Sequence, residues 1–289
     1  MEQMQTDDDI TIITSFLDIG RGEWNNEWRR QPQYYIDSFL IYLRYPYRMV
    51  CYIDDRYIDD IIREYEKSEY RNKQFIPINI QWLKENIYAW QNFEKEKEIL
   101  ESDLFMSIIN NRFKFMDMNR FDVNRNIKGY LFPENVYPEY NVVNHAKIDF
   151  IMHSIQNNYV NTSHVCWCDF GLFYSYHKDG IYPNGILDIN KLNREKINMC
   201  VTNDVTVNDT NMYYVLLYAP ETFLGGFIFG KKELMEKLQI MYHECLDELH
   251  NNYITDDDQH VYLRCYIKNP DLFELFQTKD NHVMNIFSR

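Results

Sequence analysis

Glycine, proline and cysteine are scarce in this chain of 289 residues, which contains nine, eight and six of them. Six cysteines scattered along the sequence exclude a disulfide-rich scaffold. No Pro-, Gly- or Ser-rich linker divides the chain, and 45% of its residues are hydrophobic, which is enough for a large core. We therefore expect a single domain over residues 1–289.

Positive charge and long apolar runs are also lacking. The net charge of −14 argues against a nucleic-acid partner, because such binding depends on neutralising phosphates with Lys and Arg. A small phosphorylated ligand needs only a local basic pocket and is not excluded. No apolar run approaches the ~20 residues of a membrane span, and no apolar signal segment follows Met1. These absences predict a cytoplasmic protein with no membrane span.

The chain does contain a regular alternation of apolar runs and helical patterns. Strand, helix, strand and helix are expected over residues 10–16, 32–43, 47–53 and 57–66. Farther along we expect helices over residues 81–117, 144–157, 231–251 and from about Thr255 to Pro270, strands before Asp169 and over residues 213–218 and 227–229, and a long loop over residues 118–142. The predicted fold class is α/β, a Rossmann-related mixed sheet that is mostly parallel and flanked by helices.

Asp169 ends the apolar run in the segment HVCWCDFG, residues 164–171. A buried carboxylate is costly unless it is paired or bound to a cation, and ligands bind at the carboxyl ends of strands in open α/β sheets. An enzyme that uses a metal ion to handle a nucleoside diphosphate needs a carboxylate at this place. The alternative is that Asp169 only caps a turn.

Two other interpretations of this segment fail. The Asp-Phe-Gly triplet is not a protein-kinase motif, because the Gly-rich loop, strand lysine and His-Arg-Asp loop of kinases are missing. His164, Cys166 and Cys168 alternate along one strand, and their spacing is not the Cys-x2-4-Cys of structural zinc sites. We assign these three side chains to the core.

The few glycines cluster in three turns beside expected strands. Glycine allows a left-handed backbone or a close approach to a ligand, so such clustering in a glycine-poor chain marks candidate binding loops. The residues concerned are Gly20, Gly22, Gly171, Gly225, Gly226 and Gly230.

Three of these segments together resemble a known family. TIITSFLDIGR over residues 11–21, Lys147 in a helix, and WCDFG over residues 167–171 are similar to the bacterial HtrL/YibB family, which is proposed to contain glycosyltransferases. Their order also resembles, more loosely, nucleotide-sugar transferases of the GT-A fold. The similarity extends from about residue 10 to about residue 276. It implies one GT-A-like domain with a nucleotide-binding half over residues 9–171 and an acceptor half over residues 172–289.

The resemblance implies roles on the donor side. The loop after the first strand would hold the nucleotide and Lys147 would contact its diphosphate. Asp169 takes the first position of an Asp-x-Asp metal motif, whose third position is Gly171 here. Mn2+ and Mg2+ are often held by one or two carboxylates plus phosphates and water, so we expect one of these ions, with His282 as a candidate second ligand. The candidate nucleotide-binding residues are Thr14, Ser15, Phe16, Asp18, Arg21, Lys147 and Asp54; for Asp54, which ends the second strand, a simple turn is the alternative.

On the acceptor side, Gly225 and Gly226 resemble the glycine-rich strand that lines the sugar site of GT-A enzymes; the alternative is a plain strand that begins with a tight turn. The run from Asp256 to Gln259 resembles an acidic helix start that bears a catalytic or sugar-binding carboxylate. Its alternative is a set of charges favoured by the helix dipole. Asp258 and then Asp257 are the candidate catalytic residues, and Gln259 is a candidate sugar or acceptor contact.

The expected function is metal-dependent transfer of a sugar from a UDP- or GDP-linked donor to a hydroxyl group of a glycan, protein or small-molecule acceptor. Two alternatives stay open. A nucleotidyltransferase has the same need for a metal and a diphosphate pocket. The other is a non-catalytic nucleotide-sugar-binding protein on a degenerate transferase fold, which is favoured by the missing carboxylate at the third position of the Asp-x-Asp motif.

Overall fold

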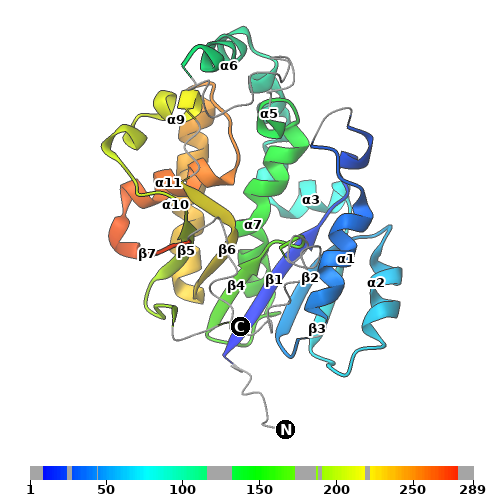
Figure 1. The fold of residues 1–289 in the computed structure, drawn as a ribbon. Helices are drawn as coiled ribbons and strands as arrows, with labels where there is room; N and C mark the ends of the chain where they lie inside the picture. The colour runs from blue at the N-terminus through cyan, green and yellow to red at the C-terminus, as the bar shows by residue number, and fades with distance from the viewer. Residues whose placement is uncertain are drawn as a thin grey trace.

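The computed structural model describes residues 9–24, 28–43, 45–115, 132–172, 187, 191–218 and 222–278. Within these residues one seven-stranded sheet has the order β3-β2-β1-β4-β6-β5-β7 (Figure 1). Its strands are β1 (Ile10–Phe16), β2 (Arg48–Asp54), β3 (Lys73–Ile78), β4 (His164–Cys168), β5 (Ile197–Val201), β6 (Phe223–Lys231) and β7 (Phe273–Gln277). β6 is antiparallel to both of its neighbours and the other pairs are parallel. The predicted mixed, mostly parallel sheet is confirmed.

Helices cover both faces of the sheet (Figure 1). Because successive strand residues point to opposite faces, Cys166 and Cys168 pack under the helices of one face, while Val165 and Trp167 pack under those of the other. The first face is covered by α1 (Pro32–Tyr42) and α2 (Ile58–Tyr65), and the second by α7 (Pro138–Gln156), α10 (Lys232–Asn251) and α11 (Asp258–Lys268). The remaining helices are α3 (Ile80–Asn86), α4 (Tyr88–Gln91), α5 (Phe93–Leu100), α6 (Asp103–Phe115) and α9 (Met212–Tyr218).

None of the helices in the described ranges is both long enough and apolar enough to cross a bilayer.

Two segments differ from the sequence-based expectation. The run over residues 213–218, predicted as a strand, is helix α9, because the Asn211 side chain accepts hydrogen bonds from the backbone N–H groups of Tyr213 and Tyr214 at 2.9 and 3.2 Å and so caps a helix start. The predicted loop over residues 118–142 is wrong at its end, because α7 begins at Pro138. Proline fits the first helical turn, where its missing N–H is not needed.

The last helix also begins later than predicted. Asp257, not Thr255, is the N-cap of α11, and its side chain accepts a hydrogen bond from the backbone N–H of Gln259. Thr255 is instead fully buried. The short strands β3, β5 and β7 had not been predicted. None of them shows a clear alternation of apolar and polar residues bounded by recognisable turns.

Candidate functional site

A pocket of about 250 Å³ opens at the carboxyl ends of β1 and β4. The chain leaves β1 toward β2 on one side, and β4 lies on the other side, so this is the switch point at which open α/β sheets bind ligands. The predicted site residues that line the pocket are Ser15, Phe16, Asp18, Arg21, Lys147 and Asp169. The structure thus brings together at one pocket segments that the order of motifs had named.

Two predicted nucleotide contacts lie elsewhere. Thr14 is fully buried within β1, and Asp54 is buried at the end of β2, where its Oδ2 accepts a hydrogen bond from the backbone N–H of Asp18 at 3.1 Å. Arg56 binds both carboxylate oxygens of Asp54 at 2.9 and 2.5 Å. Burial raises the pKa of Asp54, but the bonds from Arg56 and Asp18 outweigh it and lower the pKa. Asp54 therefore anchors the loop after β1 through its bond to Asp18. Neither Thr14 nor Asp54 lines the pocket.

Arg21 is held rigidly in the wall of the pocket. Its Nε donates to the carbonyl oxygen of Trp28 and one terminal nitrogen donates to the Tyr35 hydroxyl, both at 2.8 Å. The guanidinium also lies over the rings of Trp24 and Tyr140, 5.2 and 5.4 Å from their centroids. A fixed guanidinium suits a planar or phosphate anion, because little side-chain freedom is lost on binding.

Lys147 of α7 is the centre of the site. Its Nζ is 3.1 Å from Asp169 Oδ1, 2.8 Å from Asp258 Oδ2 and 3.1 Å from the carbonyl oxygen of Gly225. Burial lowers the pKa of the lysine, but the two carboxylates outweigh it and raise the pKa above the ordinary value. The lysine is therefore a buried, paired cation, and Trp167 also fixes Asp169 by donating from Nε1 to the same Oδ1 at 2.7 Å.

Gly225 makes room for the Asp258 carboxylate, whereas a side chain at Gly226 would be in ordinary contact with Asp169. A Cβ atom on Gly225 would lie 2.1 Å from Asp258 Oδ2, and one on Gly226 would lie 3.4 Å from Asp169 Oδ2. The carbonyl oxygen of Gly226 also accepts a hydrogen bond from the backbone N–H of Asp169 at 3.0 Å. The visible role of Gly225 is thus to let β6 approach the charged centre closely; neither glycine lines the pocket.

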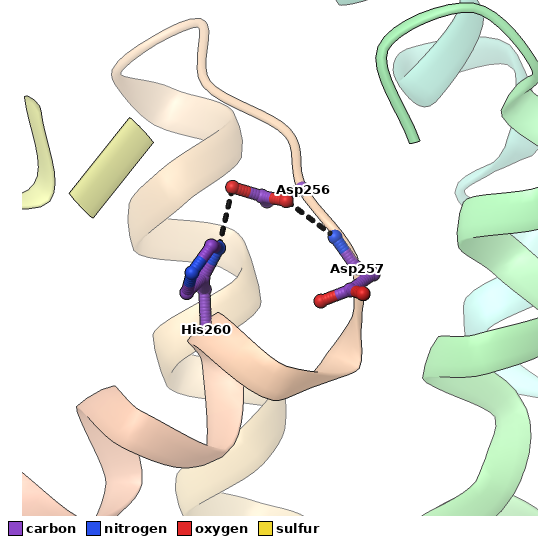
Figure 2. Close-up of side chains that lie close together, drawn as sticks. All are labelled: Asp256, Asp257 and His260. Atoms are coloured by element: carbon purple, nitrogen blue, oxygen red, sulfur yellow. Dashed lines mark hydrogen bonds and ion pairs between the residues drawn. The ribbon is translucent and has the colours of Figure 1, made fainter. Parts of the chain in front are cut away.

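The acidic start of α11 divides into separate roles (Figure 2). Asp256 accepts a hydrogen bond from the backbone N–H of Asp257 at 2.9 Å and lies 2.5 Å from His260 Nδ1. Asp257 caps the helix and also binds the side-chain amide of Gln259 at 3.1 Å. Burial, together with Asp258 and Asp256, raises the pKa of Asp257 to about 7. Ligand atoms of Asp256, Asp257 and His260 lie within 4.8 Å of one another, but hydrogen bonds inside the cluster already account for this geometry.

Asp258 does not line the pocket. Its side chain is 2% exposed and faces Lys147, whereas a general base has to reach the proton it removes. The side chain of Asp169, in contrast, is 39% exposed at the pocket wall. The Asp169 carboxylate fits a divalent ion whose remaining ligands are phosphates and water. The other predicted ligand, His282, lies outside the described residues.

The sequence-based analysis had missed several residues of the site. Trp167 lies on β4, two residues before Asp169, which directly follows the strand, so strand alternation extended by one residue places both side chains on one face. Tyr140, Val143 and Asn144 line the pocket with Lys147 as one stripe of α7. Helical spacing from Lys147 was the signal for this stripe, and the wrongly predicted loop concealed Tyr140.

Comparisons with known proteins identify a family and a relative in Escherichia coli. The profile of a family described as "Bacterial protein of unknown function (HtrL_YibB)" matches residues 8–289. Protein HtrL of Escherichia coli (strain K12) is 26% identical over 272 residues, which cover 92% of this chain and 86% of that protein.

Two solved structures show a weak similarity to this chain, with low sequence identity and low TM-scores. Mouse xyloside xylosyltransferase 1 in its apo form is 9% identical, with a TM-score of 0.38, over 92% of this chain and 84% of that chain. The 4-diphosphocytidyl-2C-methyl-D-erythritol synthase of Anaerococcus prevotii DSM 20548 is 12% identical, with a TM-score of 0.38, over 95% and 88%. The family match extends over nearly the whole sequence, and this chain belongs to the HtrL/YibB family.

Proposed function

We propose that the pocket binds a nucleotide-sugar, linked to UDP or GDP, and that the protein transfers its sugar to an acceptor hydroxyl of a glycan, protein or small molecule. The observation that supports this most is the charged centre at the switch point of the sheet. There a buried ammonium, Lys147, and a partly exposed carboxylate, Asp169, meet at the pocket wall. A diphosphate leaving group requires positive charge at such a place.

The cationic groups would act on the leaving diphosphate. Lys147 and Arg21 are both fixed by several contacts, so they stabilise developing negative charge without reorganising during the reaction. Asp169 would hold the Mn2+ or Mg2+, which when bound supplies further charge neutralisation on the diphosphate. Asp258 would act through Lys147, by keeping the ammonium charged and aimed at the pocket.

The aromatic part of the wall would receive the nucleoside. Phe16, Tyr34 and Tyr35 line the pocket beside the loop after β1. Flat aromatic surfaces accommodate a base, and a few polar groups fix its orientation. In this proposal the base would lie near β1 and the sugar near Asp169.

A thermal-shift screen of UDP- and GDP-sugars, each with Mn2+ and with chelator, tests the proposal. We expect a positive shift with at least one donor, followed by sugar transfer or donor hydrolysis detected by mass spectrometry. Asp169→Asn keeps the shape of the side chain and removes its charge, so turnover should fall by about 100-fold or more while the melting temperature stays nearly constant. In a parallel assay with a nucleoside triphosphate and a sugar phosphate, release of pyrophosphate would instead identify a nucleotidyltransferase. Binding of a nucleotide-sugar without turnover would identify a binding protein.

A further inference from the structure

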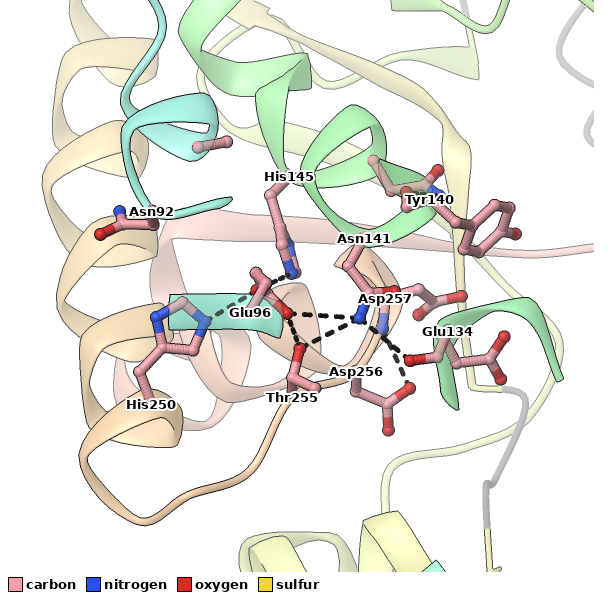
Figure 3. A network of polar contacts seen from close by, with 12 residues as sticks. Asn92, Glu96, Glu134, Tyr140, Asn141, His145, His250, Thr255, Asp256 and Asp257 are labelled. Carbon is pink, nitrogen blue, oxygen red and sulfur yellow. Dashed lines mark hydrogen bonds and ion pairs between the residues drawn. The ribbon is translucent and has the colours of Figure 1, made fainter. Parts of the chain in front are cut away.

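Glu96 of α5 lies in the interior, away from the pocket, at the meeting point of four segments (Figure 3). Its Oε1 is 2.7 Å from His250 Nε2 of α10 and 3.4 Å from His145 Nε2 of α7. Its Oε2 accepts hydrogen bonds from the side-chain amide of Asn141, at 3.3 Å, and from the hydroxyl of Thr255. One carboxylate thus joins α5, α7, α10 and the segment before α11.

Charged groups are costly to bury, and this network buries a carboxylate with two histidines. Burial raises the pKa of Glu96, but the bonds from His145 and His250 outweigh it and hold the pKa well below its ordinary value. Burial lowers the pKa of His145, but Glu96 outweighs it and raises the pKa, with help from Asp258 and Asp257. An apolar cluster would often be as stable as such a buried ion pair. Stability alone therefore does not explain the network.

What the network does fix is the geometry of the Lys147–Asp258 pair. His145 and Asn141 lie on the same helix as Lys147, two and six residues before it. Thr255 begins the short segment that leads into Asp258, and Asn141 binds the Thr255 hydroxyl as well, at 3.1 Å. Both partners of the pair are thus tied to one buried carboxylate.

We infer that Glu96 is a positioning residue that sets the distance between Lys147 and Asp258 by anchoring Thr255 to α7. This inference rests on the proposed function of that pair. Glu96 touches neither the pocket nor a ligand, so it acts through the start of α11.

The chain offers a matched control in Asp149 of α7, which is also buried and whose carboxylate also contacts α10. Its Oδ1 is 2.7 Å from His243 Nε2 and accepts from the Gln239 amide at 3.0 Å, and its Oδ2 accepts from the backbone N–H of Ala89 at 3.0 Å. Both residues are thus buried carboxylates paired with a histidine of α10, and only Glu96 binds Thr255.

The experiment compares Glu96→Gln with Asp149→Asn by hydrogen exchange and by donor turnover. Glu96→Gln should speed amide exchange over residues 254–260 and lower sugar transfer by ~10- to 100-fold, the scale of a misplaced reactive group. Asp149→Asn should lower the melting temperature without either effect. Thr255→Val, which removes one hydroxyl, should reproduce the Glu96→Gln pattern, and Thr255→Ser should restore the parent behaviour.

The outcomes separate this inference from the proposed function. Equal effects of Glu96→Gln and Asp149→Asn on exchange over residues 254–260 would overturn the inference, as would a Thr255→Val protein with parent exchange and turnover. A parent protein that neither binds nor turns over any nucleotide-sugar would overturn the proposed function alone. The exchange comparison would still decide whether Glu96 holds the start of α11.

Discussion

Arg56 and Lys147 each pair with two carboxylates at the carboxyl edge of the sheet, yet their surroundings differ. The Arg56 side chain is 56% exposed where it joins Asp54 to Asp18. Lys147 is almost completely enclosed between Asp169 and Asp258. Water reaches the Arg56 guanidinium, although Asp54 itself is buried, and this first centre acts as a clamp on a loop. The second centre concentrates charge at low dielectric, where charge acts strongly on a ligand.

Removing the enclosed cation should have the largest effect. Lys147→Met leaves Asp258 buried without its partner and should lower the free energy of unfolding at neutral pH by about 3–5 kcal/mol. Burial already raises the pKa of Asp258, and loss of the ammonium raises it further. The folded state then binds a proton that the unfolded state releases, so stability should fall as pH rises. Urea unfolding between pH 5 and 8 measures this slope, and Lys147→Arg is the charge-preserving control. A flat profile would contradict the enclosed ion pair.

The glycine pair provides a sharper probe of the same centre. Gly225→Ala places a methyl group where the Asp258 carboxylate now lies and should cost about 1–3 kcal/mol, as overpacking does. Gly226→Ala brings its methyl group only to 3.4 Å from Asp169 Oδ2 and should cost clearly less. Thermal unfolding of both variants checks the order. A reversed order would place Asp258 elsewhere.

Opening the exposed clamp should have the smallest effect. Arg56→Gln should lower the free energy of unfolding by less than Lys147→Met does, because the guanidinium is exposed to water and the buried Asp54 keeps its hydrogen bond from the backbone N–H of Asp18. The pKa of Asp54 is lowered in the folded protein, so its stabilising contribution is present above the unfolded pKa of ~3.9 and is lost as pH falls through the folded pKa. The parent and variant should therefore differ at pH 7 and converge in acid. A loss as large as that of Lys147→Met would erase the contrast between the two centres.

The local features of the site were predictable from the sequence. Asp169 carried its own signal because it follows an apolar run, whereas Lys147 and Arg21 were named through the resemblance to a known family. The sheet was predictable wherever strand and helix periodicities alternate. Helix α9 was not, because one cap from Asn211 outweighs the strand preference of an aromatic run.

Relations across the chain were not predictable. Nothing near Gly225 in the sequence indicates that its missing side chain makes room for Asp258. Likewise, Glu96 binds Thr255 across 159 positions, and neither residue lies in a recognisable motif. Such contacts depend on how α7, α10 and α11 pack, which the residue patterns of a single sequence do not specify.

The antiparallel strand β6 has a consequence for biosynthesis. It enters the sheet between β4 and β5, and α11, which bears Asp258, is made later still. A nascent chain that has reached only β4 already presents Lys147 and Asp169 but lacks the strand and helix that enclose them. Because such non-local pairings form late, competence for the proposed reaction should appear only near the end of synthesis. Incomplete chains released during translation would then have no transferase activity.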